Sequence, residues 1–281
     1  MLAFCHFRRT LLLIAAFTAA PLSAQAQGKL DASYTVTLAG IPIGKGDWTV
    51  EISDTHYSAS ASGAATGLMR VLTSAHGATN ATGTFVDGQL VASTYYSTIT
   101  NYKKTDSVRL MVSDGEVKEA KVDPPQDKDP ARVPLTDEAE KGVIDPMSAS
   151  LMRMPGAGNP IAPEACQRTL PIFDGKIRYD LQLAFKRMEL VKADKGYAGP
   201  AVVCAISFTP VAGYVPSRAA IRYISGTRDI EVWLVPIAGT RVLVPFRAQS
   251  PTPIGPVVFE ADKFVSAAMP TRASVNGAKA Q

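Results

Sequence analysis

Residues 173–185, FDGKIRYDLQLAF, decide the class of fold that this chain adopts. From Ile177 to Leu183 every second residue is apolar, and the residues between them are polar or charged. Such alternation places the apolar side chains on one face of a β-strand, where they can be buried together. Asp174 and Gly175 precede the strand and are typical of a tight turn. The stretch therefore predicts a structural turn followed by a half-buried strand.

The same pattern recurs on both sides of this stretch. Strands are expected at residues 33–38, 48–52, 57–61, 82–86, 90–100, 107–112, 116–122, 199–208, 229–235 and 242–246. The dipeptides Asp87-Gly88 and Asp114-Gly115, and the run GIPIGKG at 40–46, are expected to form hairpin turns. Because short turns join successive strands, an antiparallel meander is favoured. So many strands must hide their edges, and we therefore predict a mainly β fold curled into an open barrel or β-spiral.

Two segments depart from the alternation and predict one or two short helices. They are TGLMRVLT at 66–73 and DPMSASLMRM at 145–154. In the second, Met147, Leu151 and Met154 recur at helical spacing. We interpret this stripe as the core-facing side of a helix and not as a soft-metal site, because no histidine or cysteine adjoins it.

The mature chain is expected to form a single β-rich domain at residues 27–281. Its N-terminal half, about 30–122, and its C-terminal half, about 143–265, are joined by residues 123–142, which are rich in proline and acidic residues. Proline cannot donate to a strand ladder, so this connection is expected to be exposed. A flexible tail is expected from about 266 to 281.

Residues 1–26 have the order of a secretory signal peptide. Arg8 and Arg9 precede an apolar run from Leu11 to Ala20, and small residues follow up to Ala26. The run is about ten residues long, whereas a membrane-spanning helix needs roughly 20. We therefore expect cleavage after Ala26, release of a soluble protein into the periplasm, and no transmembrane segment.

Two cysteines remain after cleavage, Cys166 and Cys204. In an oxidising compartment an isolated pair usually forms a disulfide. A redox-active pair or a nucleophile is the alternative, but the two residues are far apart in sequence and neither has a histidine nearby. We predict an intramolecular disulfide between Cys166 and Cys204.

Charge and motifs exclude several function classes. The formal net charge is +4, of which the signal peptide supplies two charges, so the clustered basic excess of a nucleic-acid surface is missing. No Gly-x-Ser-x-Gly elbow, phosphate-binding loop or set of metal ligands occurs, and we expect no cofactor, no metal and no catalytic residues. The alternative, a hydrolase, would need His56 or His76 beside an acid and a nucleophile in a pocket. Asp180 and Glu231 alternate with apolar residues and are expected to face outward.

Several motifs, taken in their order, resemble one family of Gram-negative envelope proteins. They are Tyr34-x-Val36, IPIGKG at 41–46, TGLMRVLTSAHG at 66–77, DPMSASLMRM at 145–154, FDGKIRYDL at 173–181 and the strand with Val232, Trp233 and Leu234. From about Leu30 to Phe264 the chain is similar to the family catalogued as domain of unknown function 3108. The resemblance implies a secreted, barrel-like protein without an established activity. The paired cysteines and β character are also similar to periplasmic β-spiral proteins that support envelope integrity.

Two functions from different classes remain open. The first is a non-enzymatic periplasmic protein that contributes to cell-envelope maintenance by binding an envelope protein. The second is a carrier that holds a lipid or another apolar ligand inside the barrel. In either case we expect the protein to be a monomer and to bind no nucleic acid. The candidate apolar lining residues are Tyr34, Val36, Trp48, Tyr179, Leu181 and Trp233.

Overall fold

The fold is mainly β, as expected, and its strands form one sheet that is not closed. The computed structural model describes residues 27–86 and 89–269. The expected signal peptide, the Asp87-Gly88 turn and residues 270–281 lie outside the described residues. None of the described helices is long and apolar enough to span a bilayer.

The elements follow one another as a long series of hairpins with short helices between them. The strands are β1 (Gly28–Leu38), β2 (Ile41–Ile52), β3 (His56–Ala65), β4 (His76–Val86), β5 (Gln89–Asn101), β6 (Lys104–Ser113), β7 (Glu116–Asp123), β8 (Met152–Arg153), β9 (Arg168–Phe173), β10 (Arg178–Lys192), β11 (Lys195–Gly196), β12 (Ala198–Ala212), β13 (Ile230–Pro236), β14 (Val242–Ser250) and β15 (Val257–Ala268). The helices are α1 (Gly67–Thr73), α2 (Pro146–Ala149) and α3 (Ala219–Gly226), with 3-10 turns η1 (Asp137–Glu140) and η2 (Pro163–Cys166).

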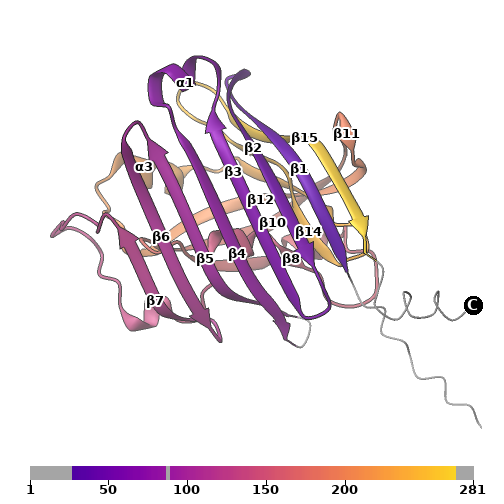
Figure 1. Ribbon diagram of the computed structural model, residues 1–281, viewed down its shortest axis with the longest axis horizontal. Helices are drawn as coiled ribbons and strands as arrows, with labels where there is room; N and C mark the ends of the chain where they lie inside the picture. The colour runs from indigo at the N-terminus through magenta and orange to yellow at the C-terminus, as the bar shows by residue number, and fades with distance from the viewer. Residues whose placement is uncertain (1–26, 87–88, 270–281) are drawn as a thin grey trace, which may run out of the picture.

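Pairing between the first and last strands joins the two halves of the chain. The strand order is β7-β6-β5-β4-β3-β2-β1-β15-β14-β13-β12-β10-β9, and neighbouring strands in this path are antiparallel. β1 pairs with β15 along its whole length, from Gly28 opposite Ala268 to Leu38 opposite Val257. In Figure 1, β1 to β7 form a broad front layer, and β10, β12 and β14 lie behind it. The sheet therefore folds back over itself.

The two ends of the sheet, β7 and β9, are linked by the end of the proline-rich connection. Lys141 forms an antiparallel bridge with Glu116, and the Val143 N–H donates to the Gly115 carbonyl at 3.0 Å. Ile144 then forms a parallel bridge with Ile172 of β9. This short segment supplies backbone partners that an exposed sheet edge would lack.

Both faces of the C-terminal part of the sheet are buried. Along β12 and β13, Val203 and Trp233 belong to one core cluster, and Cys204 and Leu234 belong to another. Because successive strand residues point to opposite faces, each cluster covers one face. A third cluster packs β4 to β6 against Phe173 of β9.

The turn that opens the decisive stretch lies against the β5–β6 layer. Asp174 Oδ1 accepts hydrogen bonds from the N–H groups of Lys176 (2.8 Å) and Ile177 (2.7 Å). Gly175 has a φ of +90°, and a Cβ there would lie 2.4 Å from Val108 Cγ1. Only glycine fits both the backbone conformation and the space.

Four expectations need correction. GIPIGKG was expected to form the turn at 40–46, but only Ala39 and Gly40 turn, and β2 already begins at Ile41. The described residues contain three α-helices instead of one or two, because α3 was not anticipated. The helix expected at 145–154 comprises only Pro146–Ala149, so Leu151 and Met154 lie beyond it. β15 continues to Ala268 through its pairing with Gly28, and residues 270–281 of the expected tail lie outside the described residues.

The expected disulfide is present. Cys166 and Cys204 are bonded, with their Cα atoms 5.3 Å apart, and both are fully buried. The bond attaches η2 to β12 on the face covered by Met152 and Met154. It therefore holds the segment before β9 against the sheet.

Replacing Cys204 with serine is expected to lower the free energy of unfolding by about 4 kcal/mol, because the bond closes a separation of 38 residues in the unfolded chain. Guanidinium denaturation of the wild type, of Cys204→Ser and of the double variant with Cys166→Ser measures the loss. The double variant should match the single one. Two free thiols in the native wild type would contradict the assignment.

Candidate functional site

An apolar cavity of about 310 Å³ lies between α2 and the sheet. Its walls include Tyr34 (β1), Trp48 (β2), Ala61 (β3), Tyr95 (β5), Met147 (α2) and Phe259 (β15). Its polar lining consists of Asp47, Ser62, Thr79 and Ser150. The cavity thus combines a mostly apolar wall with a few polar groups, as small-molecule sites do.

Packed aromatic rings form one side of the cavity. The Tyr34 and Phe259 rings stack with centroids 4.1 Å apart, and Trp48 lies 6.4 Å from Tyr34 at a tilt of 43°. The Tyr34 hydroxyl donates to the Pro245 carbonyl at 2.8 Å. Burial raises the pKa of Tyr34, so its hydroxyl stays a neutral donor. This wall is held rigidly by β1, β14 and β15.

The opposite side of the cavity is formed by α2, a helix of only four residues. Asp145 Oδ1 accepts a hydrogen bond from the Ser148 N–H at 2.9 Å and so caps the helix. The Tyr57 hydroxyl of β3 donates to Ser148 Oγ at 2.6 Å. An isolated helix of this length is unstable in water, so the cap and the bond to β3 hold it in place.

Asp145 is a buried carboxyl group. Its side chain is 1% exposed, and Oδ2 has no hydrogen-bond partner among the described residues. Burial raises its pKa, although hydrogen bonds from Ser148 and its neighbours act in the opposite direction. Burial thus disfavours the ionised form of Asp145, the residue that caps α2 and holds it in place.

A trough of glycines extends the cavity along the sheet. Gly46, Gly63 and Gly77 lie opposite one another on β2, β3 and β4, and Ile99 on β5 continues the row. A hollow of about 260 Å³ along this row shares Ala61, Ser62 and Thr79 with the cavity. Ile99 is 58% exposed, so the trough is open at this end. The trough escaped sequence reasoning because glycines on three strands form a row only once the register is known.

The structure places two of the six expected lining residues in the cavity. Tyr34 and Trp48 lie in its wall. Val36, Tyr179 and Leu181 do not: Tyr179 packs against Phe208, and Leu181 packs against the disulfide cluster. The alternation of apolar and polar residues shows which side chains of a strand are buried. Whether those buried side chains line a cavity depends on how the sheet folds back over itself.

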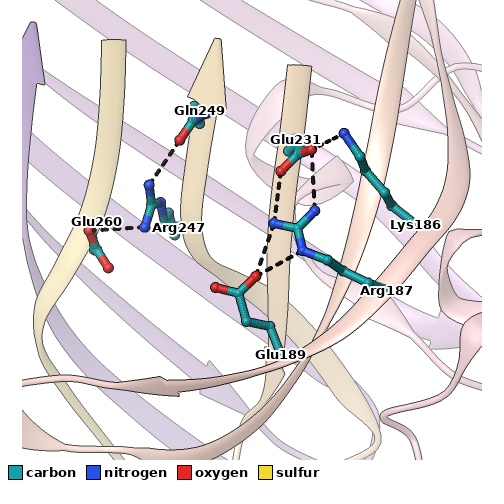
Figure 2. Close-up of polar contacts among 7 residues, drawn as sticks. All are labelled: Lys186, Arg187, Glu189, Glu231, Arg247, Gln249 and Glu260. Atoms are coloured by element: carbon teal, nitrogen blue, oxygen red, sulfur yellow. Dashed lines mark hydrogen bonds and ion pairs between the residues drawn. The ribbon is translucent and has the colours of Figure 1, made fainter. Parts of the chain in front are cut away.

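Trp233, the sixth expected residue, lies beneath a network of charges. The guanidinium carbon of Arg247 lies 4.7 Å from its ring centroid, and that of Arg187 lies 5.3 Å away. Figure 2 shows the network from Lys186 and Arg187 to Glu231. These side chains fill the space that a ligand would need beside Trp233.

Glu231 was expected to face outward, and this was wrong. The residue is 7% exposed and forms ion pairs with Arg187 at 3.1 Å and with Lys186. Burial acts to raise the pKa of Glu231, but hydrogen bonds from Arg187 and Lys186 hold it below its ordinary value. Figure 2 shows two separate sets of contacts: Lys186 and Arg187 pair with Glu189 and Glu231, and Arg247 contacts Glu260 and Gln249. Each set balances its cations with the same number of carboxylates.

His56 and His76, the two histidines among the described residues, lie apart from the cavity. The ring of His56 contacts Thr55 Oγ1, the ring of His76 contacts the Ser74 carbonyl, and both side chains are exposed. Within the described part of the chain, no three His, Cys, Asp or Glu side chains gather as a metal site would require.

The charge on Asp145 is expected to make stability depend on pH. Because the folded pKa is raised, the carboxyl costs stability as the pH rises from its unfolded pKa, near 3.8, through its folded pKa. Asp145→Asn keeps the Oδ1 acceptor without the charge. The free energy of unfolding of Asp145→Asn minus that of the wild type should therefore increase as the pH is raised from 4 to 7.

Urea denaturation at several pH values measures this difference. Asp145→Ala serves as the matched variant, because it loses the cap and should cost about 1 kcal/mol. A difference between Asp145→Asn and wild type that is flat with pH would contradict the buried charge.

Comparisons with known proteins name no activity. No curated protein matches the chain at a significant level. A crystal structure of a beta-barrel-like protein of domain of unknown function DUF1849 from Brucella abortus is similar over 86% of this chain and 98% of its own, at 11% identity and a TM-score of 0.44. A family model described as protein of unknown function, DUF3108, matches residues 33–262. The chain therefore belongs to the DUF3108 family.

Proposed function

We propose that the mature chain is a secreted, non-enzymatic binding protein of the periplasm that holds one apolar ligand in the cavity beneath α2. The observation that carries this proposal is the open, aromatic-lined cavity itself, because a well-packed core leaves few voids of this size. A role in envelope maintenance is part of the proposal and would follow from carrying an envelope component.

The size of the cavity selects the class of ligand. At about 310 Å³ it lies at the lower end of the range for small-molecule sites, roughly 300 to 1,000 Å³. Together with the glycine trough, it forms an elongated hollow between Tyr34 and Ile99. This shape suits a single acyl chain or a similarly narrow molecule better than a lipid with two chains.

The polar groups suit a ligand with a small polar end. Thr79 on β4 and Ser150 after α2 contribute polar side chains to the lining. The side chains of Asp47 and Ser62 alternate with Trp48 and Ala61 and point to the opposite face of the sheet. Apart from Asp47, the lining carries no ionisable group that would select a strongly charged ligand; Tyr34 and Tyr95 have pKa values raised by burial and remain neutral. Binding in place of catalysis is further favoured because Ser148, beside Asp145, is fully buried.

Trp48 provides a direct reporter of ligand binding. The chain has two tryptophans, so Trp233→Phe leaves Trp48 as the only one. Titration of this variant with lauric acid should change Trp48 emission and saturate at one ligand per chain. Trp48→Phe, in which only the shielded Trp233 remains, should show no change.

A second pair of variants tests the location of the ligand. Ala61→Leu adds three carbons to the cavity wall and should weaken lauric acid binding at least tenfold, because each buried methylene displaced from the ligand is worth about 0.8 kcal/mol. Ser60→Leu adds a larger side chain to the exposed face of the same strand and should leave affinity unchanged. Equal affinity in Ala61→Leu and wild type, measured by calorimetry, would refute the proposed site.

A further inference from the structure

Four segments that are distant in sequence meet at one end of the sheet. They are the β1–β2 turn, α1, the β5–β6 turn and the β14–β15 loop, and we call them together the α1 end (Figure 1). The Ala39 N–H donates to the Pro256 carbonyl at 2.9 Å, and the Thr66 N–H donates to the Ile43 carbonyl at 2.9 Å. The Tyr102 N–H donates to the Thr73 carbonyl at 3.2 Å. These bonds join the four segments into one surface.

Each segment of the α1 end presents a large apolar side chain to solvent. The exposed fractions are 66% for Ile41, 76% for Val71, 62% for Tyr102 and 71% for Ile254. Leu72 adds a second exposed side chain from α1. Single exposed apolar residues are common, but such a gathering on adjacent loops marks an interaction surface.

The charge of the α1 end has one sign. Lys45, Arg70, Lys103 and Lys104 lie in or beside its four segments, and residues 38–45, 65–76, 101–105 and 250–256 contain no acidic residue. Among the described residues, only Lys104 of these four cations has an ion-pair partner, Asp106 at 3.8 Å.

The opposite end of the same strands is acidic. Its β2–β3 turn contains Asp54, and its β6–β7 turn contains Asp114 followed by Glu116. Glu116 is paired with Lys118. The two ends of the front layer therefore differ in charge, and among the described residues Lys45, Arg70 and Lys103 at the apolar end have no ion-pair partner.

We propose that the α1 end docks on the surface of an anionic phospholipid bilayer. Exposed apolar side chains that insert at the boundary of headgroups and acyl chains, surrounded by lysine and arginine, are the combination that such a surface attracts. The four cations face the lipid phosphates, and Ile41, Val71, Leu72 and Ile254 enter the interface. Charge complementarity identifies the partner, since a neutral protein partner would leave Lys45, Arg70 and Lys103 without a counter-charge.

This docking does not require the cavity to hold a ligand, but it would place the open end of the trough near the bilayer. Ile99, at that end, is three residues before Tyr102 on the same hairpin. A ligand that leaves the membrane would meet the trough first.

Flotation of the mature protein with vesicles tests the proposal. Vesicles of phosphatidylcholine with 30% phosphatidylglycerol should carry the wild type, whereas vesicles of phosphatidylcholine alone should carry at least tenfold less. Val71→Ser combined with Leu72→Ser, and separately Lys103→Gln combined with Lys104→Gln, should each reduce binding about tenfold. Raising the salt concentration should weaken binding of the wild type.

Matched controls separate docking from general stickiness. Leu190→Ser removes the most exposed large apolar side chain elsewhere, and Lys121→Gln with Lys128→Gln removes two exposed cations away from the α1 end. Both should bind vesicles like the wild type, and circular dichroism should show every variant folded. Wild type that fails to float, control variants that lose binding equally, or an α1 end that instead buries itself in a dimer would each overturn the proposal.

Discussion

Antiparallel pairing between β1 and β15 is the interaction on which the rest of this structure depends. It joins eleven residues at the start of the described chain to the last strand, and so merges two meanders into one sheet. Without it, β1 and β15 would each be an exposed edge, which proteins avoid because unpaired strands recruit other chains. The pairing also makes the sheet fold back, so that the face of β1 to β3 packs against β12 to β14. The core cluster that these strands share follows from that geometry.

The cavity lies where the connection after β7 returns to the folded-back sheet and leads into α2. The connection from β7 returns to the sheet at Lys141–Ile144, which bonds to the β6–β7 turn and to β9, and the chain then enters α2. Because α2 has only four residues, it covers the inner face incompletely, and the glycines of β2 to β4 provide no side chains to fill the remaining space. Aromatic rings on one side and a short, capped helix on the other leave a hollow that a narrow apolar molecule can occupy.

Much of the fold could be predicted from local patterns, because alternation, turn dipeptides and an isolated cysteine pair each act over a few residues. The disulfide, α1, the start of α2 and strands β1 to β7, β10 and β12 to β14 were anticipated, whereas β8, β9 and β11 were not. β15 was missed, since a bulge at its pairing with Ser33 and Tyr34 interrupts its alternation. The cavity was anticipated only at Tyr34 and Trp48, because its other walls depend on long-range register. Gly44 and Gly46 were interpreted as part of a turn. In the sequence alone, a glycine in a turn cannot be distinguished from a glycine in a strand that lines a hollow without a side chain.

The central claim is that the hollow between α2 and the sheet is a ligand site. The most direct measurement is solvent extraction and mass spectrometry of the protein purified from cells without detergent, compared with the Ala61→Leu variant prepared in the same way. The account predicts that the wild type releases an apolar molecule with one chain, near one per protein, and that the variant releases far less. Equal amounts from both proteins, or none from either after purification from cells rich in lipid, would contradict it.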